Sequence, residues 1–368
     1  MNELQIWTAE VVYTGFGTPM RHGGLLVQGG YVVRTGPLEE LRRCYPEAEV
    51  VHRGKALTPP VVNAHTHLDL STTPRFQGPY PAFIRHVIAH RSSRTPAAVR
   101  QGLAELQKNG AGAFGDIAYN LEGAAWLVEN SPLPGVVYLE VIHRNPQEAE
   151  AVASRLAHLV ARLQRRSRRL RVGLAPHTPF NVSPPLLKRL SELAQKEGFP
   201  LQMHVAESPE ETELLTQGRG ALQAIPQSLG LPPYQDLPGL TPVRYLAKLG
   251  VLGPHLTLVH GVQVDEEEVQ MLAQSGSRVV SCPRSNAALD CGEFPWALYL
   301  KHGLEVALGT DSLASSPDLD VRNEALALWG KVDPRVLVRA ATRSGYRTLG
   351  LETPRITRGT PVSQVQSW

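Results

Sequence analysis

The stretch VVNAHTH (residues 61–67) joins a short apolar run to two histidines at its carboxyl end. The apolar run predicts a buried β-strand. Side chains two positions apart in a strand point to the same face, so His65 and His67 should face one way and Thr66 the other. Imidazole is a common ligand of zinc and iron. The pair by itself fits two surface histidines at a turn as well as it fits a metal site.

Four further segments repeat this pattern of an apolar run that ends in histidine, glutamate or aspartate. The polar residues that follow these runs are His177 after 170–175, His204 and Glu207 after 200–203, His260 after 256–259, and Asp311 after 304–308. Each of them alone is as consistent with a helix cap or a hydrogen-bonded buried histidine as with a functional site. Seven such residues at the ends of five predicted strands instead indicate one metal ion, an activated water and a hydrolytic enzyme.

Strands and helices alternate from residue 57 onward, which is the pattern of a (β/α)8 barrel. The eight predicted strands are 57–63, 112–117, 135–142, 170–175, 200–204, 256–260, 278–281 and 304–308. The predicted helices include 97–108, 146–164, 184–196, 266–275, 323–331 and 334–349. In such a barrel the carboxyl ends of the strands carry the active site, and this is where the histidines and acids are predicted to lie.

Residues 1–54 contain short strand candidates separated by glycines and no polar cluster of this kind. The candidates are 6–13, 24–27, 31–33 and 49–52. We therefore expect an α/β protein with a (β/α)8 TIM barrel over residues 55–349. A small β-rich accessory domain should be formed by residues 1–54 together with the tail at about 350–368. The Gly/Pro-rich segment 218–242 is long for a connection between a strand and a helix, and it predicts a loop beside the site.

The composition is that of an ordinary globular protein, with 42% hydrophobic residues, 19% charged residues and a net charge of +3. So small a charge predicts neither a nucleic-acid nor a membrane partner. The arginines of 162–171 fit the solvated end of a helix, with a phosphate-binding patch as the alternative. Cys44, Cys282 and Cys291 form no CxxC pair, which favours a reducing compartment. Without a long apolar run or a signal-peptide pattern, we expect a cytoplasmic protein with a small-molecule substrate, and a homo-oligomer is left open.

Longer motifs around these residues resemble those of the amidohydrolase superfamily, in particular its mononuclear aminohydrolase and chlorohydrolase branch. The matching segments extend over nearly the whole chain and are NAHTH (63–67), PHTPF (176–180), HVAE (204–207), LVHG (258–261), CPRSN (282–286) and GTDSLAS (309–315). The resemblance implies a barrel with a small β-domain and one divalent transition metal, zinc as the first choice and iron as the alternative. Its ligands would be His65, His67, His204 and Asp311.

The same resemblance implies catalytic and substrate-binding roles. Glu207 would move protons, His260 would orient the attacking water together with Asp311, and His177 would contact the substrate. Some relatives bind a second metal through a carboxylate of the third strand, where this chain has Glu140.

Further features of the chain refine these expectations. The fourth strand, 170–175, contains no lysine, which disfavours the dinuclear type built on a carbamylated lysine. Arg144 follows the third strand and is a candidate partner for a substrate carboxylate, with an ordinary loop arginine as the alternative. The tail PVSQVQSW (361–368) is short for this family, so the small domain is expected to be reduced.

Within the branch, the chain most resembles deaminases of aminated purine-like compounds. This implies a metal-dependent hydrolase of carbon–nitrogen bonds other than peptide bonds, which deaminates a purine-like nucleoside or base and releases ammonia. Removal of chlorine or hydrolysis of an amide by the same site is the alternative among enzymes. A catalytically silent metal-binding relative is the alternative outside them, although the presence of all seven site residues speaks against it.

Overall fold

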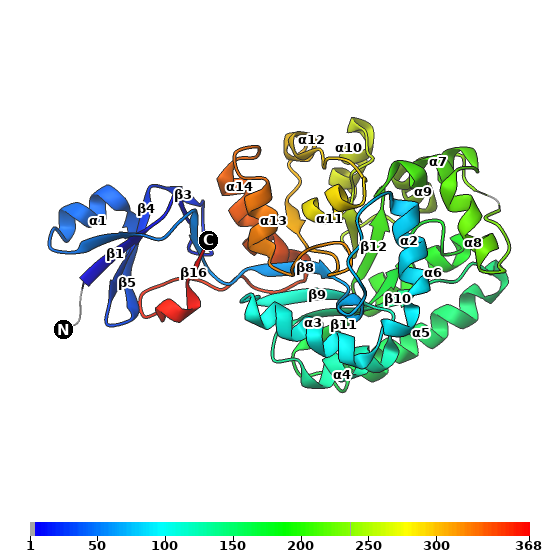
Figure 1. The fold of residues 1–368 in the computed structure, drawn as a ribbon, viewed down its shortest axis with the longest axis horizontal. Helices are drawn as coiled ribbons and strands as arrows, with labels where there is room; N and C mark the ends of the chain where they lie inside the picture. Colours follow the sequence, from blue (N-terminus) through cyan, green and yellow to red (C-terminus); the bar gives the residue numbers. More distant parts are fainter. Residues whose placement is uncertain (1–3, 236) are drawn as a thin grey trace.

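Eight parallel strands form a barrel in the computed structural model, which describes residues 4–235 and 237–368 (Figure 1). In chain order they are β8 (Val62–Thr66), β9 (Ala113–Ala118), β10 (Gly135–Val141), β11 (Leu170–Pro176), β12 (Leu201–Val205), β13 (Leu256–His260), β14 (Arg278–Ser281) and β15 (Val306–Leu308). Each strand pairs in parallel with the next along the chain. A parallel bridge between Thr66 and Asp311 connects the end of the eighth strand to the first. The predicted (β/α)8 fold is therefore confirmed.

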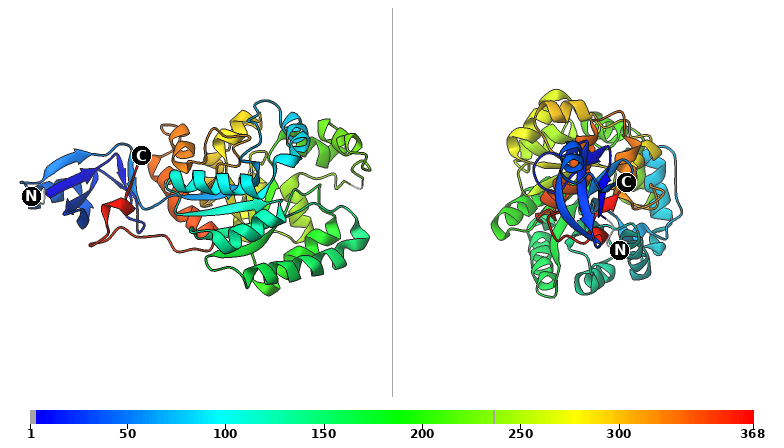
Figure 2. Two further views of the ribbon diagram at one scale, coloured as in Figure 1. Left: turned by 60° about the horizontal axis from the view of Figure 1, so that its bottom comes forward. Right: turned by 90° about the vertical axis from the view of Figure 1, so that its left-hand side faces the viewer.

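Helices surround the barrel on its outside (Figure 2). Because the strands are buried on both faces, their sequences are mostly continuous apolar runs rather than alternating ones. The longer helices are α2 (Tyr80–Ala89), α3 (Pro96–Lys108), α4 (Leu121–Asn130), α5 (Ala149–Gln164), α6 (Pro184–Glu197), α7 (Pro209–Gln217), α9 (Pro242–Leu249) and α10 (Glu266–Ser275). Local capping fixes where some of them begin. At the start of α10, Asp265 accepts a hydrogen bond from the backbone N–H of Glu268 at 2.9 Å, as part of a capping box.

The small domain consists of two four-stranded sheets built from both ends of the chain. The first has the order β5 (Tyr31–Pro37), β4 (Gly23–Gln28), β1 (Leu4–Thr8) and β6 (Glu49–His52). The second has the order β16 (Gln366–Ser367), β7 (Ala56–Thr58), β2 (Val11–Val12) and β3 (Met20–Arg21). Because β16 pairs antiparallel with β7, the C-terminal tail completes the small domain as predicted.

The single strand predicted at 57–63 is wrong in its extent, because two prolines interrupt it. Pro59 and Pro60 have no backbone N–H to donate to a sheet. The residues before them form β7 in the small domain, and those after them form β8 in the barrel. We infer that the boundary between the two domains lies at these prolines, slightly beyond the predicted boundary at 54/55.

Two helix predictions near the C-terminus also differ from the structure. The helix predicted at 323–331 is α13 (Val321–Ala327), and it begins earlier because Asp320 caps it by accepting from the backbone N–H of Arg322 at 2.9 Å. The helix predicted at 334–349 consists of three consecutive segments, namely α14 (Pro334–Arg339), a π-helical stretch (Ala340–Ser344) and α15 (Gly345–Thr348).

The end of the barrel that carries the site is the one remote from the small domain. Strand β8 begins on the side facing the small domain and runs away from it (Figure 1). At the remote end, α2 (Tyr80–Ala89) and the segment 218–242 cover the barrel. This segment contains the short helix α8 (Ala224–Ser228), and its residue 236 lies outside the described residues. Among the described residues, none of the helices combines the length and the apolar character that crossing a bilayer requires.

Candidate active site

The carboxyl ends of four barrel strands bring four histidines and an aspartate together. The residues are His65 in β8 and His67 just after it, His204 in β12, His260 at the end of β13, and Asp311 just after β15. Potential ligand atoms of His65, His67 and Asp311 lie within 4.8 Å of one another, as do those of His65, His204 and His260. The Nε2 atoms of His65 and His67 each lie 3.7 Å from Oδ1 of Asp311. All four predicted metal ligands are thus gathered at one point.

Hydrogen bonds to the Nδ1 atoms orient three of these imidazole rings. The acceptors are Gln202 Oε1 for His65 at 2.8 Å, the backbone oxygen of His177 for His204 at 3.0 Å, and Asn286 Oδ1 for His260 at 2.8 Å. An Nδ1–H donor to an oxygen leaves the Nε2 lone pair of a neutral ring free. Each ring therefore presents Nε2 to the centre of the cluster, which is the arrangement that metal-binding histidines normally have.

The free Nε2 atoms fit a bound cation. The Nε2 atoms of His65 and His260 are buried and have no hydrogen-bond partner among the described residues. The Nε2 atoms of His67 and His204 lie only 3.1 Å apart. Buried polar atoms are normally satisfied, so unpartnered nitrogens that converge in this way point to a missing partner. Three imidazoles and one carboxylate suit a divalent transition metal.

Electrostatics of the cluster favour the protonation states that a metal needs. Burial, followed by the neighbouring imidazoles, lowers the pKa of His67 and of His204 well below the usual value. Burial alone would raise the pKa of Asp311, but the neighbouring imidazoles of His65 and His67 lower it below its usual range. Ser285 Oγ also donates to the Asp311 carboxylate at 2.6 Å. Neutral imidazoles and an ionised carboxylate are the states in which these groups ligate metals.

The backbone at the strand ends is strained, which is common at functional sites. Ala206, His260 and Asp311 have positive φ values of 54°, 75° and 60°, which side chains other than glycine rarely adopt. Gly309 is required for a different reason. A Cβ atom there would lie 2.7 Å from Cβ of His65, so only glycine lets the eighth strand approach the first this closely.

Glu207 lies beside the cluster but outside both groups of potential metal ligands. Its Oε1 is 3.4 Å from Nε2 of His260, and its side chain is 5% exposed. Burial, with a contribution from the charge of Asp311, raises the pKa of Glu207 to about 8. The carboxylate of Glu211 holds the backbone of Glu207 in place by accepting a hydrogen bond from its N–H at 2.8 Å. A carboxyl group that can hold a proton near neutral pH is suited to general acid–base chemistry.

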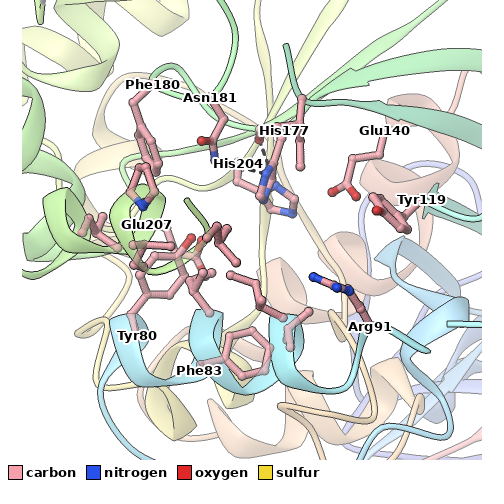
Figure 3. A pocket seen from close by; sticks show the side chains of 18 of the residues that line it. Tyr80, Phe83, Arg91, Tyr119, Glu140, His177, Phe180, Asn181, His204 and Glu207 are labelled. Carbon is pink, nitrogen blue, oxygen red and sulfur yellow. Dashed lines mark hydrogen bonds between the residues drawn. The ribbon is translucent and has the colours of Figure 1, made fainter. Parts of the chain in front are cut away.

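A cavity of about 310 Å³ opens above the cluster (Figure 3). Its walls are mostly apolar and aromatic and include Tyr80, Phe83, Phe180, Ile225 and Tyr234. The floor is polar and is lined by His67, His204, Glu207, His260 and Asp311. An apolar cavity with a few convergent polar groups is the usual form of a small-molecule site.

His177 lines the same cavity, and its contact with the substrate stays a prediction. Its ring is edge-on to that of His204, with 5.3 Å between ring centroids. Asn181 Nδ2 lies 3.3 Å from Nδ1 of His177, and Tyr234 donates its hydroxyl to Asn181 at 2.9 Å. The histidine is therefore held from the side of segment 218–242, which lies beside the site as predicted.

Arg144 also lines the cavity, but its guanidinium already has partners. It donates to the backbone oxygens of Pro232 at 2.9 Å and Pro233 at 2.6 Å, and it stacks on the ring of Tyr234 at 4.3 Å. Its pairing with a substrate carboxylate therefore remains a prediction. Arg91 is a second arginine at the cavity, and Figure 3 shows its guanidinium extending into it.

Glu140 lies in β10, in the wall of the cavity, and belongs to neither group of potential metal ligands among the described residues. Its Oε2 lies 3.6 Å from the guanidinium of Arg94. An arginine in this position competes with a second metal ion for the carboxylate, so the arrangement favours another role for Glu140.

Several residues of the site were not predicted from the sequence. They are Gln202 and Asn286, which orient imidazoles, and Tyr80, Arg91 and Arg94, which line the cavity. Gln202 left a detectable signal, since it is a polar residue within the apolar strand β12. Tyr80, Arg91 and Arg94 left no such signal in the sequence, because α2 and the turn after it contact the site only through the tertiary fold.

Comparison with known proteins identifies the family. The model of the Amidohydrolase family matches residues 56–361, and a model of a bacterial imidazolonepropionase-like composite domain matches residues 23–48 in the small domain. An aminodeoxyfutalosine deaminase of Deinococcus radiodurans is 43% identical over 373 residues, which cover 96% of this chain and 88% of that protein.

Solved structures share the fold. The aminofutalosine deaminase of Helicobacter pylori in complex with methylthio-coformycin has a TM-score of 0.75 and 21% identity, covering 97% of this chain and 90% of its own. An adenosine deaminase from Xanthomonas campestris with bound zinc has a TM-score of 0.68 and 22% identity, covering 97% and 83%.

Fold and site thus define a barrel hydrolase with a candidate metal site at its floor. The chain belongs to the amidohydrolase family, and it is a hydrolase of carbon–nitrogen bonds other than peptide bonds.

Proposed function

We propose that the protein is a metal-dependent hydrolytic deaminase of an aminated purine-like nucleoside or base. The candidate substrate is aminodeoxyfutalosine, an intermediate of the menaquinone route. The observation that carries the proposal is the position of Glu207 beside the histidine–aspartate cluster, at the floor of a largely apolar cavity. The 43% identity to an aminodeoxyfutalosine deaminase supports the choice of substrate.

We assign the metal to His65, His67, His204 and Asp311, with zinc as the first choice and iron as the alternative. The unpartnered Nε2 of His65, the close approach of the Nε2 atoms of His67 and His204, and the ionised carboxylate of Asp311 support this assignment. The zinc in the Xanthomonas campestris structure supports the choice of metal. When bound, a divalent metal would lower the pKa of water from ~16 towards ~7 and so make hydroxide available near neutral pH.

The residues around the metal would carry out the remaining steps. Glu207 takes a proton from the water and gives it to the ring nitrogen next to the carbon that bears the amine. His260 and Asp311 orient the water, whose oxygen bonds to that carbon and makes it tetrahedral. The proton of the new hydroxyl group then passes to the exocyclic amine, the bond between this carbon and the amine breaks, ammonia leaves, and a carbonyl group remains. General acid–base catalysis of this kind contributes ~10²–10⁴-fold to the rate.

The walls of the cavity suit an aromatic substrate. Phe83, Phe180 and Tyr80 offer apolar faces on which a flat ring can pack. His177 would contact that ring from the side. For a substrate with an acidic group, Arg91 and Arg144 lie at the cavity, and Arg91 is the better candidate because the guanidinium of Arg144 is already hydrogen-bonded.

An ammonia-release screen tests the proposal directly. The panel contains aminodeoxyfutalosine, adenosine, adenine, a chlorinated triazine and simple amides, each with wild-type protein and with Glu207→Gln. We expect ammonia from aminated purine derivatives with the wild type only. Turnover of triazines or amides, with none of any aminopurine derivative, would contradict the proposal and favour the chlorohydrolase or amide hydrolase alternative. No turnover at all by the metal-loaded protein would favour the silent relative.

A further inference from the structure

A buried acidic group faces the cavity on the side away from Glu207. Glu140 lies in β10, and its side chain is only 4% exposed. Its Oε2 has no hydrogen-bond partner among the described residues. Figure 3 shows the carboxylate of Glu140 on one side of His177, together with Tyr119, and Glu207 on the other side. A buried carboxylate oxygen without a donor is costly, so this oxygen indicates a donor that the protein itself does not provide.

Arg94 holds Glu140 in place without satisfying it. The guanidinium of Arg94 lies 3.6 Å from Glu140 Oε2, which is too long for a hydrogen bond. The same guanidinium donates to Asp69 Oδ1 at 2.9 Å and stacks on the ring of Tyr119 at 4.5 Å. The backbone oxygen of Arg94 accepts from the side chain of Asn120 at 2.9 Å. The arginine is therefore fixed from several directions, and its charge balances part of the charge of Glu140.

The surroundings of Glu140 select the kind of donor. Two carboxylates, those of Asp69 and Glu140, share the single positive charge of Arg94. Glu140 therefore still favours a ligand that donates hydrogen bonds. A cationic ligand is disfavoured, because Arg91 extends into the same side of the cavity (Figure 3). Neutral hydroxyl groups meet both conditions, since they donate hydrogen bonds and carry no charge.

We propose that Glu140, positioned by Arg94, accepts hydrogen bonds from sugar hydroxyl groups of the substrate and makes the site selective for nucleosides over free bases. The inference rests on the proposed function for the class of ligand, and it adds a residue that determines specificity. Glu140 and Glu207 would then contact opposite ends of one substrate molecule, the sugar and the aminated ring, with His177 between them. Chlorinated triazines and simple amides have no such hydroxyl pair.

Binding in an inactive background tests this proposal independently of turnover. Affinities of adenosine, 2′,3′-dideoxyadenosine and adenine are measured by calorimetry with the metal-loaded Glu207→Gln protein, alone and with Glu140→Gln or Glu140→Ala added. We expect the Glu207→Gln protein to bind adenosine at least about 10-fold more tightly than the dideoxy compound, as for a hydrogen bond to a charged group. Glu140→Ala should remove that difference, and Glu140→Gln should reduce it because an amide oxygen is a weaker, uncharged acceptor; both should change the affinity for the dideoxy compound by less than about 2-fold.

The matched control is Glu148→Gln, which changes a glutamate that pairs with His143 and is 53% exposed. It should leave all three affinities unchanged. Equal affinity of the Glu207→Gln protein for the two nucleosides would overturn the proposal, and this comparison needs no Glu140 variant to fold. Equal losses for both nucleosides in the Glu140 variants would also overturn it, as would binding of neither nucleoside or loss of a second bound metal.

Failure of this inference is distinguishable from failure of the proposed function. If wild-type protein releases ammonia from adenine as fast as from adenosine, the role of Glu140 is wrong and the deaminase proposal stands. If adenosine binds through its hydroxyls and no aminopurine derivative releases ammonia, the role of Glu140 stands and the deaminase proposal fails.

Discussion

The floor and the outer wall of the cavity are built in different ways. The floor consists of strand ends on a closed barrel, and its four histidines are buried, three of them with a hydrogen bond at Nδ1. The outer wall consists of α2, the turn after it that carries Arg91 and Arg94, and the segment 218–242, in which Leu229 and Leu231 are 40% and 53% exposed. Because strand ends hold side chains more precisely than loops do, we expect the floor to fix the reaction and the outer wall, together with Glu140, to set the choice of substrate. Substitutions in the floor should therefore lower kcat, and substitutions in the wall should change KM.

Removal of the metal is expected to have the largest effect. Dialysis against a chelator, or His204→Ala, should abolish ammonia release, because the water then lacks the Lewis acid that lowers its pKa. Zinc should restore the dialysed wild type and not the variant. His158→Ala, which changes an exposed histidine on α5, is the control and should keep both metal and activity. Full activity of the metal-free protein would show that a metal at the floor takes no part in the reaction.

Glu207→Gln should come next in size. The substitution keeps the shape of the side chain and removes its capacity to accept the proton, so kcat should fall by ~10²–10⁴-fold while metal content stays unchanged. Glu210→Gln, at the start of α7, is the matched control and should leave kcat near normal. Near-normal turnover of Glu207→Gln would show that Glu207 is only an acid at the start of this helix.

Gln202→Ala should have a smaller effect, because it acts through His65. Loss of the acceptor for His65 Nδ1 frees that ring to rotate, and changes of this kind typically cost ~10–100-fold in metal affinity or activity. Metal affinity and kcat measured on the same preparation should fall together, and excess zinc should restore part of the activity. Gln195→Ala on α6 serves as control. An effect on KM alone would show that Gln202 does not support the metal site.

The smallest effects are expected in the wall and should depend on the substrate. Arg91→Ala should weaken binding of an acidic substrate by about 10–100-fold, as for a charged hydrogen bond of ~1.5–3 kcal/mol, and leave neutral nucleosides nearly unchanged. Arg144→Ala should weaken both equally, because Arg144 anchors Pro232 and Pro233. Comparison of KM for one acidic and one neutral substrate decides the point. The opposite pattern would establish Arg144 as the partner of the carboxylate.

The floor was largely predictable from the sequence, because each of its strands ends in a residue of distinctive chemistry. The strand predicted at 256–260 coincides with β13, and His260 ends it. Apolar runs of this kind are local signals, and parallel strands must bring their carboxyl ends to one face of a barrel. The prolines at 59 and 60 were the local signal that was missed, and they divide one predicted strand between the two domains.

The wall was much less predictable, because its contacts are not local. Arg94 pairs with Asp69, 25 residues earlier, and with Glu140 in strand β10, and neither pairing leaves a periodic trace in the sequence. Arg144 shows the same limit. Its position after the third strand was identified, but its partners come from segment 218–242 and depend on how that segment folds over the barrel.

The central claim is that one metal at the floor of the barrel supports deamination. Titration of metal-free protein with zinc, with ammonia release from aminodeoxyfutalosine measured at each step, tests it most directly. We expect activity to rise linearly and to reach a plateau at about one zinc per chain, and Asp311→Ala to show no rise. Full ammonia release before zinc is added would contradict the claim, and a plateau at two zinc ions per chain would contradict the single-metal assignment.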